Sequence, residues 1–149
     1  MPPESGPTTN NLTAVAARSA SDVWAVGTYA TDGTEGFPDE PLVLHRDGPT
    51  WTIVPAQPLP ASGGFNGVAI GSGIHSDDVW AVGSFRSGDA LRPVVERWDG
   101  EAWTLESGVP DTAAALQAVA TAPNGAIWSV GSTAEPDQAG RTMVLRGIC

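Results

Sequence analysis

The stretch Asp-Val-Trp-Ala-Val-Gly occupies residues 22–27 and returns unchanged at residues 78–83. A variant of it, Ala-Ile-Trp-Ser-Val-Gly, follows at residues 126–131. The tryptophans of the three copies are 56 and 48 residues apart. A repeat of this length marks an array of similar supersecondary units that stack on one another, so this stretch decides the fold.

Each copy lies within a longer unit of short apolar runs. In the first unit, Leu12–Ala16 precedes the repeated tryptophan, and Leu42–Arg46 and Trp51–Val54 follow it. The runs have the length and composition of β-strands, and turn residues bound them. Asp-Gly at residues 47–48 and 99–100 joins the third run to the fourth, which predicts tight hairpins because glycine reaches positive φ freely.

Four antiparallel strands at a period of about 40–50 residues are the pattern of a β-propeller blade. The sequence therefore predicts an all-β domain over residues 10–149, preceded by a disordered segment at residues 1–9. The third unit stops after its third strand, so the last blade is incomplete. The blades are expected at about residues 10–57, 64–107 and 115–149.

The blade pattern also predicts where small and large side chains lie. The tryptophan of the second strand alternates faces with its neighbours, so Trp24 and Trp80 should fill the space between blades. The first strand lines the crowded central axis of a propeller, and small residues suit that place. Small residues recur there in all three units: Ala14, Ala16, Gly67, Ala69, Ala118 and Ala120.

Three blades are too few for a closed ring, because single-chain propellers typically have four to eight. Three explanations stay open. The chain is a piece of a larger propeller, or two copies close a six-bladed ring head to tail, or the chain is an open stack. Open ends would expose sheet edges and apolar faces, which favour association.

The full pattern is apolar-x-x-Val-Ala, Ser-x-x-Asp-Val-Trp-Ala-Val-Gly and apolar-x-x-Arg-(Trp)-Asp-Gly-x-x-Trp. It resembles the Asp-Val-Trp-Ala-Val-Gly propeller repeats of actinobacterial and related bacterial proteins, which are grouped loosely with kelch-type and galactose-oxidase central-domain propellers. The resemblance covers residues 10–148 and implies a mostly secreted or surface-associated β scaffold. It implies no catalytic residues, and the copper ligands of galactose oxidase have no match among one tyrosine, one cysteine and two histidines.

Composition narrows the partners. The chain has a formal net charge of -10 and no lysine, so nucleic acid and anionic membrane surfaces are not expected partners. No apolar run is long enough to span a bilayer, and residues 1–7 lack the regions of a signal peptide. Localisation therefore stays open between a cytosolic chain and one cut from a leader or a larger parent. Cys149 is the single cysteine, which excludes an internal disulfide.

The expected binding surface is formed by the loops after each second strand, at residues 28–41, 84–93 and 132–141. All three would lie on one face of a propeller, and rigid scaffolds commonly bind ligands through such loops. Aromatic and arginine side chains there could stack on a sugar and hydrogen-bond to it. The predicted ligand-binding residues are Tyr29, Phe37, Phe85, Arg86, Arg92 and Arg141.

No metal or cofactor site is predicted. His45 and His75 lack a second histidine or cysteine at metal-ligand spacing. Acidic residues crowd the first loop, but their spacing matches no calcium-binding pattern, which favours a solvated acidic loop. Asp22 and Asp78, just before the repeated tryptophans, are interpreted as turn formers whose carboxylates accept backbone N–H bonds.

The sequence therefore favours a non-catalytic propeller module that binds or scaffolds, with a protein or carbohydrate ligand of the kind a lectin takes. Two alternatives remain. One is a hydrolase or lyase, because a fold does not determine function. The other is a purely structural segment of a longer propeller protein. The acids considered for the enzyme alternative are Asp32, Asp39, Glu40 and Asp89.

Overall fold

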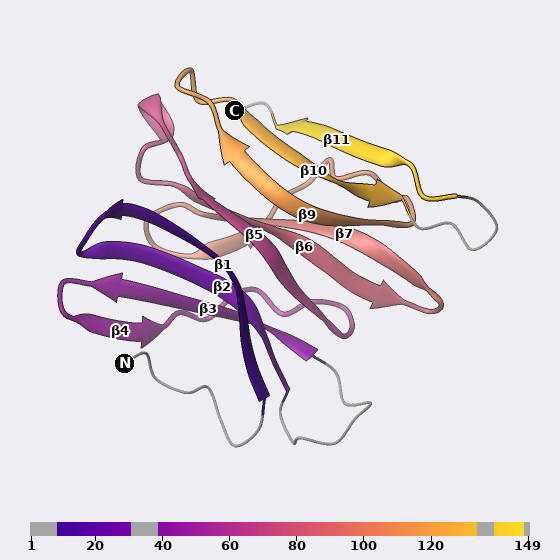
Figure 1. The fold of residues 1–149 in the computed structure, drawn as a ribbon, viewed down its shortest axis with the longest axis horizontal. Coiled ribbons are helices and arrows are strands. Elements are labelled where there is room, and N and C mark those ends of the chain that lie inside the picture. The colour runs from indigo at the N-terminus through magenta and orange to yellow at the C-terminus, as the bar shows by residue number, and fades with distance from the viewer. Residues whose placement is uncertain (1–8, 31–38, 134–138, 148–149) are drawn as a thin grey trace.

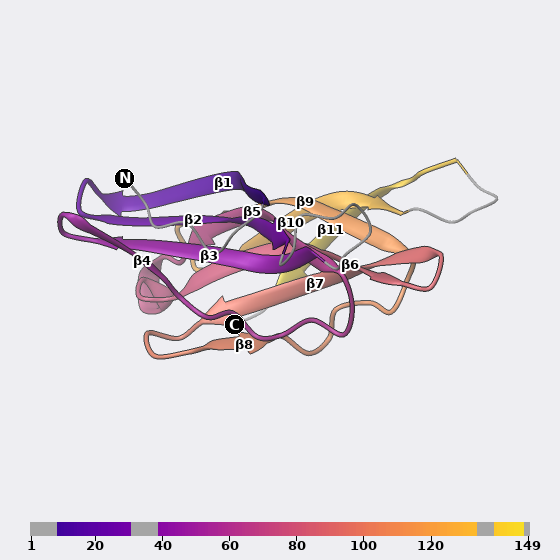
Figure 2. The same cartoon turned by 90° about the horizontal axis from the view of Figure 1, so that it is seen from below.

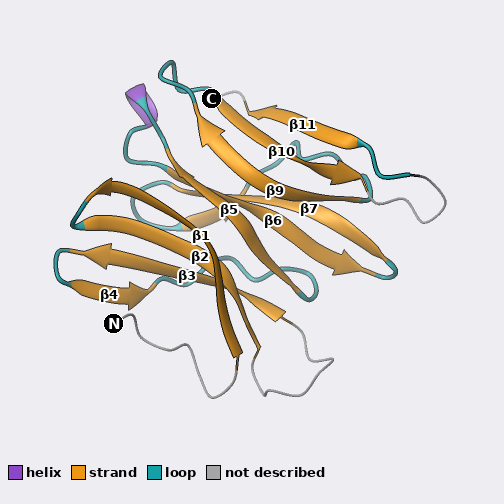
Figure 3. Cartoon of the chain, viewed as in Figure 1, coloured by secondary structure: helices purple, strands orange, loops and turns teal. Residues whose placement is uncertain are grey.

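The computed structural model describes residues 9–30, 39–133 and 139–147. Over these residues the chain is all-β, with eleven strands in three antiparallel sheets and no α-helix (Figure 3). A single 3₁₀ turn, η1 (Gly73–His75), lies between two strands. The prediction of an all-β chain is confirmed, whereas residues 1–8 and Phe37 lie outside the described residues.

The strands of each sheet follow one another in chain order, so every sheet is a meander. Sheet A contains β1 (Thr9–Ser19), β2 (Asp22–Ala30), β3 (Asp39–Asp47) and β4 (Thr50–Ile53). Sheet B contains β5 (Gly63–Ile70), β6 (Val79–Ser87), β7 (Ala90–Trp98) and β8 (Trp103–Leu105). Sheet C contains β9 (Ala114–Thr121), β10 (Ile127–Thr133) and β11 (Thr142–Gly147).

The three sheets form an open stack with sheet B between sheets A and C (Figure 1). The first strand of sheet B, β5, contacts both β1 and β9. Figure 2 shows β1 and β9 toward one side of the molecule and β4 and β8 toward the other. First strands therefore meet along one side, fourth strands lie at the outer rim, and sheets A and C end the stack.

Two of the three repeated tryptophans lie between sheets. Trp24 is 2% exposed and packs in one cluster with Phe65, Val79 and Trp103 of sheet B. Trp80 is 6% exposed, as predicted, whereas Trp128 is 42% exposed. The difference follows from the order of the stack, because sheet B covers Trp24, sheet C covers Trp80, and none of the described sheets covers Trp128.

A bulge in each first strand links the sheets. The strand pairing skips Thr13 in β1, Asn66 in β5 and Gln117 in β9, at equivalent places. The Thr13 hydroxyl donates to the carbonyl oxygen of Phe65 at 2.6 Å, and the Asn66 amide donates to that of Leu116 at 2.8 Å. Thr13 and Asn66 therefore each bond to the next sheet. Gln117 occupies the equivalent bulge position in sheet C, at the end of the stack.

The turns confirm one sequence prediction and correct another. Gly48 and Gly100 take positive φ of 62° and 102° between third and fourth strands, as the Asp-Gly pairs predicted. The long loop predicted over residues 84–93 is wrong, because β6 continues to residue 87 and β7 begins at residue 90. Gly88 at φ 62° permits a two-residue hairpin there.

Candidate functional site

Apart from Phe37, which is outside the described residues, the predicted ligand-binding residues lie at the end of the sheets where second strands pass into third strands. Tyr29 is near the end of β2, and Phe85 and Arg86 are on β6. Arg92 is on β7 rather than on a loop, and Arg141 directly precedes β11. Their strand positions were missed because residues 84–93 contain glycine, proline and charged residues that resemble a loop.

Three of these residues serve packing or ion pairing. Phe85 packs against the cluster between sheets A and B, and Tyr29 packs against a second cluster on the outer face of sheet A. The Arg92 guanidinium lies 3.1 Å from the Asp111 carboxylate and donates to the Asp111 carbonyl oxygen at 3.0 Å. Exposed ion pairs of this kind contribute little stability, so Arg92 mainly orders the connection before β9.

Arg86 lines a polar pocket of about 200 Å³ between sheets A and B, which we name the loop-end pocket. The Ser62 hydroxyl in this pocket accepts a hydrogen bond from the Asp39 backbone N–H at 2.8 Å. The lining combines guanidinium, carboxyl, amide and hydroxyl groups, which suits a small polar group. The polar lining residues are Thr28, Asp39, Ser62, Asn66, Ser84 and Arg86.

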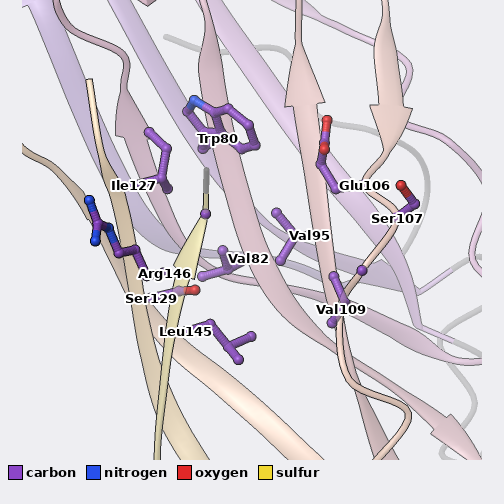
Figure 4. Close-up of a pocket in the computed structure, with 12 residues that line it drawn as sticks. Trp80, Val82, Val95, Glu106, Ser107, Val109, Ile127, Ser129, Leu145 and Arg146 are labelled. Carbon is purple, nitrogen blue, oxygen red and sulfur yellow. The ribbon is translucent and has the colours of Figure 1, made fainter. Parts of the chain in front are cut away.

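A second pocket, of about 210 Å³, lies between sheets B and C, and we name it the B–C pocket (Figure 4). Trp80, Val82 and Val95 line it from sheet B. Sheet C contributes Ile127, Ser129, Leu145, Arg146 and Gly147, and the chain after β8 contributes residues 106–109. Its lining is more apolar than that of the loop-end pocket.

Each repeated tryptophan has a basic partner directly opposite on the third strand. The rings of Trp24 and His45 stack with centroids 4.1 Å apart. The Arg97 guanidinium lies 5.5 Å from the Trp80 ring centroid, and the Arg146 guanidinium lies 5.6 Å from that of Trp128. A guanidinium over an indole is a cation–π contact, so the third strands carry basic residues for a packing reason.

The aspartates before the tryptophans bind these basic partners. Asp78 accepts hydrogen bonds from Arg97 at 2.7 Å and from His75 at 3.0 Å. Asp22 accepts one from His45 at 2.9 Å and another from Arg18. Partial burial raises the pKa of Asp22, but the bonds from His45 and Arg18 outweigh it and hold that pKa below its ordinary value.

The predicted turn role of these aspartates therefore needs correction, because the donors to their carboxylates are side chains. The predicted Asx turn occurs in the third unit, where the Asn124 side chain accepts from the Ala126 N–H at 3.1 Å. Ala126 takes the place of the aspartate there. In the described part of the chain, Arg146 accordingly has no carboxylate partner.

Glu96 is a buried acid that the sequence did not reveal. It lies on β7, is 0% exposed and faces sheet A. One carboxyl oxygen accepts the Gln57 N–H at 3.1 Å, and the other has no hydrogen-bond partner. Burial raises the pKa of Glu96 to about 7, although the Gln57 bond opposes the shift. Glu96 aligns with Leu44 in sheet A and with Leu145 in sheet C. Because both of these residues are apolar, this alignment was the signal in the sequence that position 96 is buried.

Within the described ranges, no three histidine, cysteine, aspartate or glutamate side chains gather where they could hold a metal ion. Over the same ranges, no helix is long and apolar enough to cross a membrane. A comparison with models of known protein families finds no match to this chain, and a comparison with curated proteins finds none either.

Proposed function

We propose that this chain is a non-catalytic β-propeller module, each sheet being one blade, that binds a protein or glycan ligand. The observation that carries the proposal is that the repeated residues serve architecture. A Cβ on the motif glycines, Gly27, Gly83 or Gly131, would lie within 2.0 Å of a carbonyl oxygen on the neighbouring first strand. Trp24 and Trp80 pack between sheets, and Asp22 and Asp78 pair with basic side chains.

The loop-end pocket is the proposed ligand site. Its donors and acceptors match a sugar hydroxyl or a polar side chain of a protein, and the rigid sheets on either side fix their positions. Arg86 contributes the cation of this pocket. The resemblance to bacterial propeller repeats agrees with a binding role at a cell surface or outside the cell, and remains a prediction.

Binding to a glycan array and a peptide array tests this function. We expect retention of a ligand class on one array, and a loss of at least tenfold in affinity for Arg86→Ala, because the cation of the pocket is removed. Arg46→Ala is the matched control, since it removes the same charge at the opposite end of β3. Turnover of a substrate by the chain, or retention of nothing on both arrays, would contradict the proposal.

We also propose that two copies close a six-bladed ring, because the ends of the stack repeat faces that already pack together. Trp128, Val130 and Val144 are exposed on the outer face of sheet C. They align with Trp24, Val26 and Val43, which sheet B buries. On the outer face of sheet A, the exposed Leu12 and Val15 align with Phe65 and Val68, which are buried against sheet A.

The hydrogen bonds of the bulges support the same arrangement. The carbonyl oxygens of Phe65 and Leu116 accept these hydrogen bonds from the preceding sheet. Leu12 occupies the equivalent position in sheet A. In a ring, Gln117 would donate to the carbonyl of Leu12 in the second copy. This head-to-tail contact is heterologous, and it closes when two 180° rotations complete the circle.

Light scattering tests ring closure. We expect a mass twice the 15.3 kDa of one chain, and a single-chain mass for Val144→Glu, which places a charge on the outer face of sheet C. Ile74→Glu is the control, because Ile74 is also exposed to solvent but lies on η1, away from that face. A single-chain mass for the unmodified protein would refute ring closure and leave the proposed ligand site unaffected.

A further inference from the structure

The B–C pocket corresponds to the place that Trp103 fills between sheets A and B. Trp103 is 1% exposed, and its ring centroid lies 5.7 Å from that of Trp24 and 5.9 Å from that of Trp98. Its backbone carbonyl accepts a hydrogen bond from the Gln57 side chain at 2.9 Å. Trp103 is therefore the side chain that closes this interface near the outer rim.

The neighbours of Trp103 have counterparts in the B–C pocket, as strand pairing shows. Trp80 takes the place of Trp24, and Gly147 takes the place of Trp98. Leu145 takes the place of Glu96, and the residues after β8 take the place of those after β4. All of these counterparts line the pocket. A tryptophan is what the pocket lacks, because sheet C has no fourth strand among the described residues.

The strand edge beside the pocket is open as well. In sheets A and B the third strand pairs with a fourth strand, in which Trp51 lies opposite Arg46 and Trp103 lies opposite Trp98. In the described part of the chain, β11 pairs only with β10. An open edge presents backbone N–H and C=O groups that an extended peptide can pair with.

We propose that β11 and the B–C pocket together bind an extended segment of another polypeptide with the sequence Trp-Thr-aliphatic. β4 contains Trp51-Thr52-Ile53 and β8 contains Trp103-Thr104-Leu105, so the molecule holds two templates for this segment. The segment pairs antiparallel with β11, and its tryptophan lies opposite Gly147 and enters the pocket. This site is separate from the loop-end pocket. The proposal depends on the proposed function only because it treats the chain as a binding module.

The open edge of β11 and the B–C pocket both favour a polypeptide as the ligand. A glycan lacks the regular backbone donors and acceptors that extend a sheet, whereas an extended peptide supplies them at the strand spacing. The pocket volume of about 210 Å³ is below the range of pockets for drug-sized ligands, and it suits a side chain. An indole there would contact Trp80 as Trp103 contacts Trp24.

A free segment of this type should go to β11. The equivalent edges of sheets A and B already hold β4 and β8, which are tethered to their neighbours by two-residue turns or short loops. A tether of this length gives an effective concentration in the millimolar range or above, so a dilute free peptide does not displace them.

The probe is a fluorescently labelled peptide with the sequence of residues 47–57, titrated with the full chain at physiological salt and followed by polarisation. We expect saturable binding, and at least tenfold weaker binding when the tryptophan of the peptide is replaced by alanine. Ser129→Phe, which fills the pocket, should weaken binding by a similar factor. Ile53→Ser is the control, because Ile53 is exposed on β4 and lies away from both the pocket and the outer face of sheet C, and it should leave the affinity unchanged.

The assignment is overturned if the alanine peptide binds as tightly as the tryptophan peptide, or if no binding occurs below about 1 mM. The peptide comparison uses the unmodified chain, so it holds even where Ser129→Phe fails to fold. It also separates this site from the loop-end pocket, since loss of array binding in Arg86→Ala leaves binding of the tryptophan peptide unchanged.

Discussion

The two interfaces of the stack are built from equivalent strands but are filled differently. Between sheets A and B, Trp103 and Trp98 pack against Trp24, and Glu96 is buried beside them. Between sheets B and C, the equivalent space contains Gly147, Leu145 and a pocket. The first strands are in contact in both interfaces. The fourth strand at the outer rim therefore decides how completely an interface is filled.

Removing the aromatic ring that fills the A–B interface should have the largest effect. Trp103→Ala is expected to lower the free energy of unfolding by about 3–5 kcal/mol, because it leaves a large cavity in a buried cluster. At protein concentrations where light scattering gives a single-chain mass, Trp128→Ala is the matched control, and it should cost far less because Trp128 is exposed in the single chain. Urea denaturation measures both, and equal losses would mean that Trp103 has no special part in the interface.

Glu96 should make the A–B interface sensitive to pH. Burial raises the pKa of Glu96 to about 7 from its ordinary 4.5, so the folded chain binds this proton more tightly than the unfolded chain. The resulting stabilisation is complete below the unfolded pKa, is lost as the pH rises through 7, and is absent above that. Glu96→Gln cannot ionise, so at pH 8 it should be more stable than the original by up to about 3 kcal/mol.

Urea denaturation at several pH values checks the effect of Glu96→Gln. The gain over the unmodified chain should shrink steadily toward acidic pH. Leu145→Gln, at the equivalent position of sheet C, is the control and should add no pH dependence. A constant difference between Glu96→Gln and the original at all pH values would show that this carboxyl does not titrate in the pH range of its raised pKa.

Adding volume should have opposite effects on the two interfaces. Ser129→Val places methyl groups in the B–C pocket and should stabilise the chain by about 1 kcal/mol. Ala81→Val makes a similar addition at the equivalent place of the filled interface, where Ala81 is fully buried, and should cost about 1–3 kcal/mol. Thermal unfolding of both variants gives the comparison. A destabilising Ser129→Val would indicate that the B–C interface has no spare space.

The smallest effect concerns the bulges. Thr13→Val removes the hydroxyl that donates to Phe65 across the A–B interface and should cost about 1 kcal/mol. Gln117→Leu changes the equivalent bulge residue at the end of the stack. At protein concentrations where light scattering gives a single-chain mass, this change should leave the midpoint of unfolding unmoved. A loss equal to that of Thr13→Val would assign Gln117 a partner within its own chain.

The sequence predicted the features that depend on local pattern. The strand pattern is visible in the sequence from the repeated tryptophan, the glycine that follows it and the Asp-Gly turns. The antiparallel strands and the burial of Trp24 and Trp80 could therefore be predicted. The hairpin at Gly88 was missed because a two-residue turn in a polar stretch resembles a loop. That error placed Phe85, Arg86 and Arg92 on loops rather than strands.

Features that depend on contacts between sheets could not be predicted in this way. Glu96 belongs to an ordinary strand pattern, and only the packing of sheet A against β7 buries it. The B–C pocket arises from Gly147, Leu145 and a missing ring, and it becomes visible only when strand pairing aligns the sheets. For the candidate site, the sequence analysis identified Arg86, while the polar neighbours of Arg86 come from four different strands and a connecting segment.

The equivalence of the three sheets is the central claim, and adding the missing strand tests it most directly. The sequence of residues 47–57 is placed directly after Gly147, so that its tryptophan takes the position that Trp103 has in sheet B. The measurement is the free energy of unfolding of this extended chain against the same chain with alanine for the added tryptophan. The account predicts that the tryptophan form is more stable by about 3 kcal/mol or more. Equal stability of the two forms would contradict it.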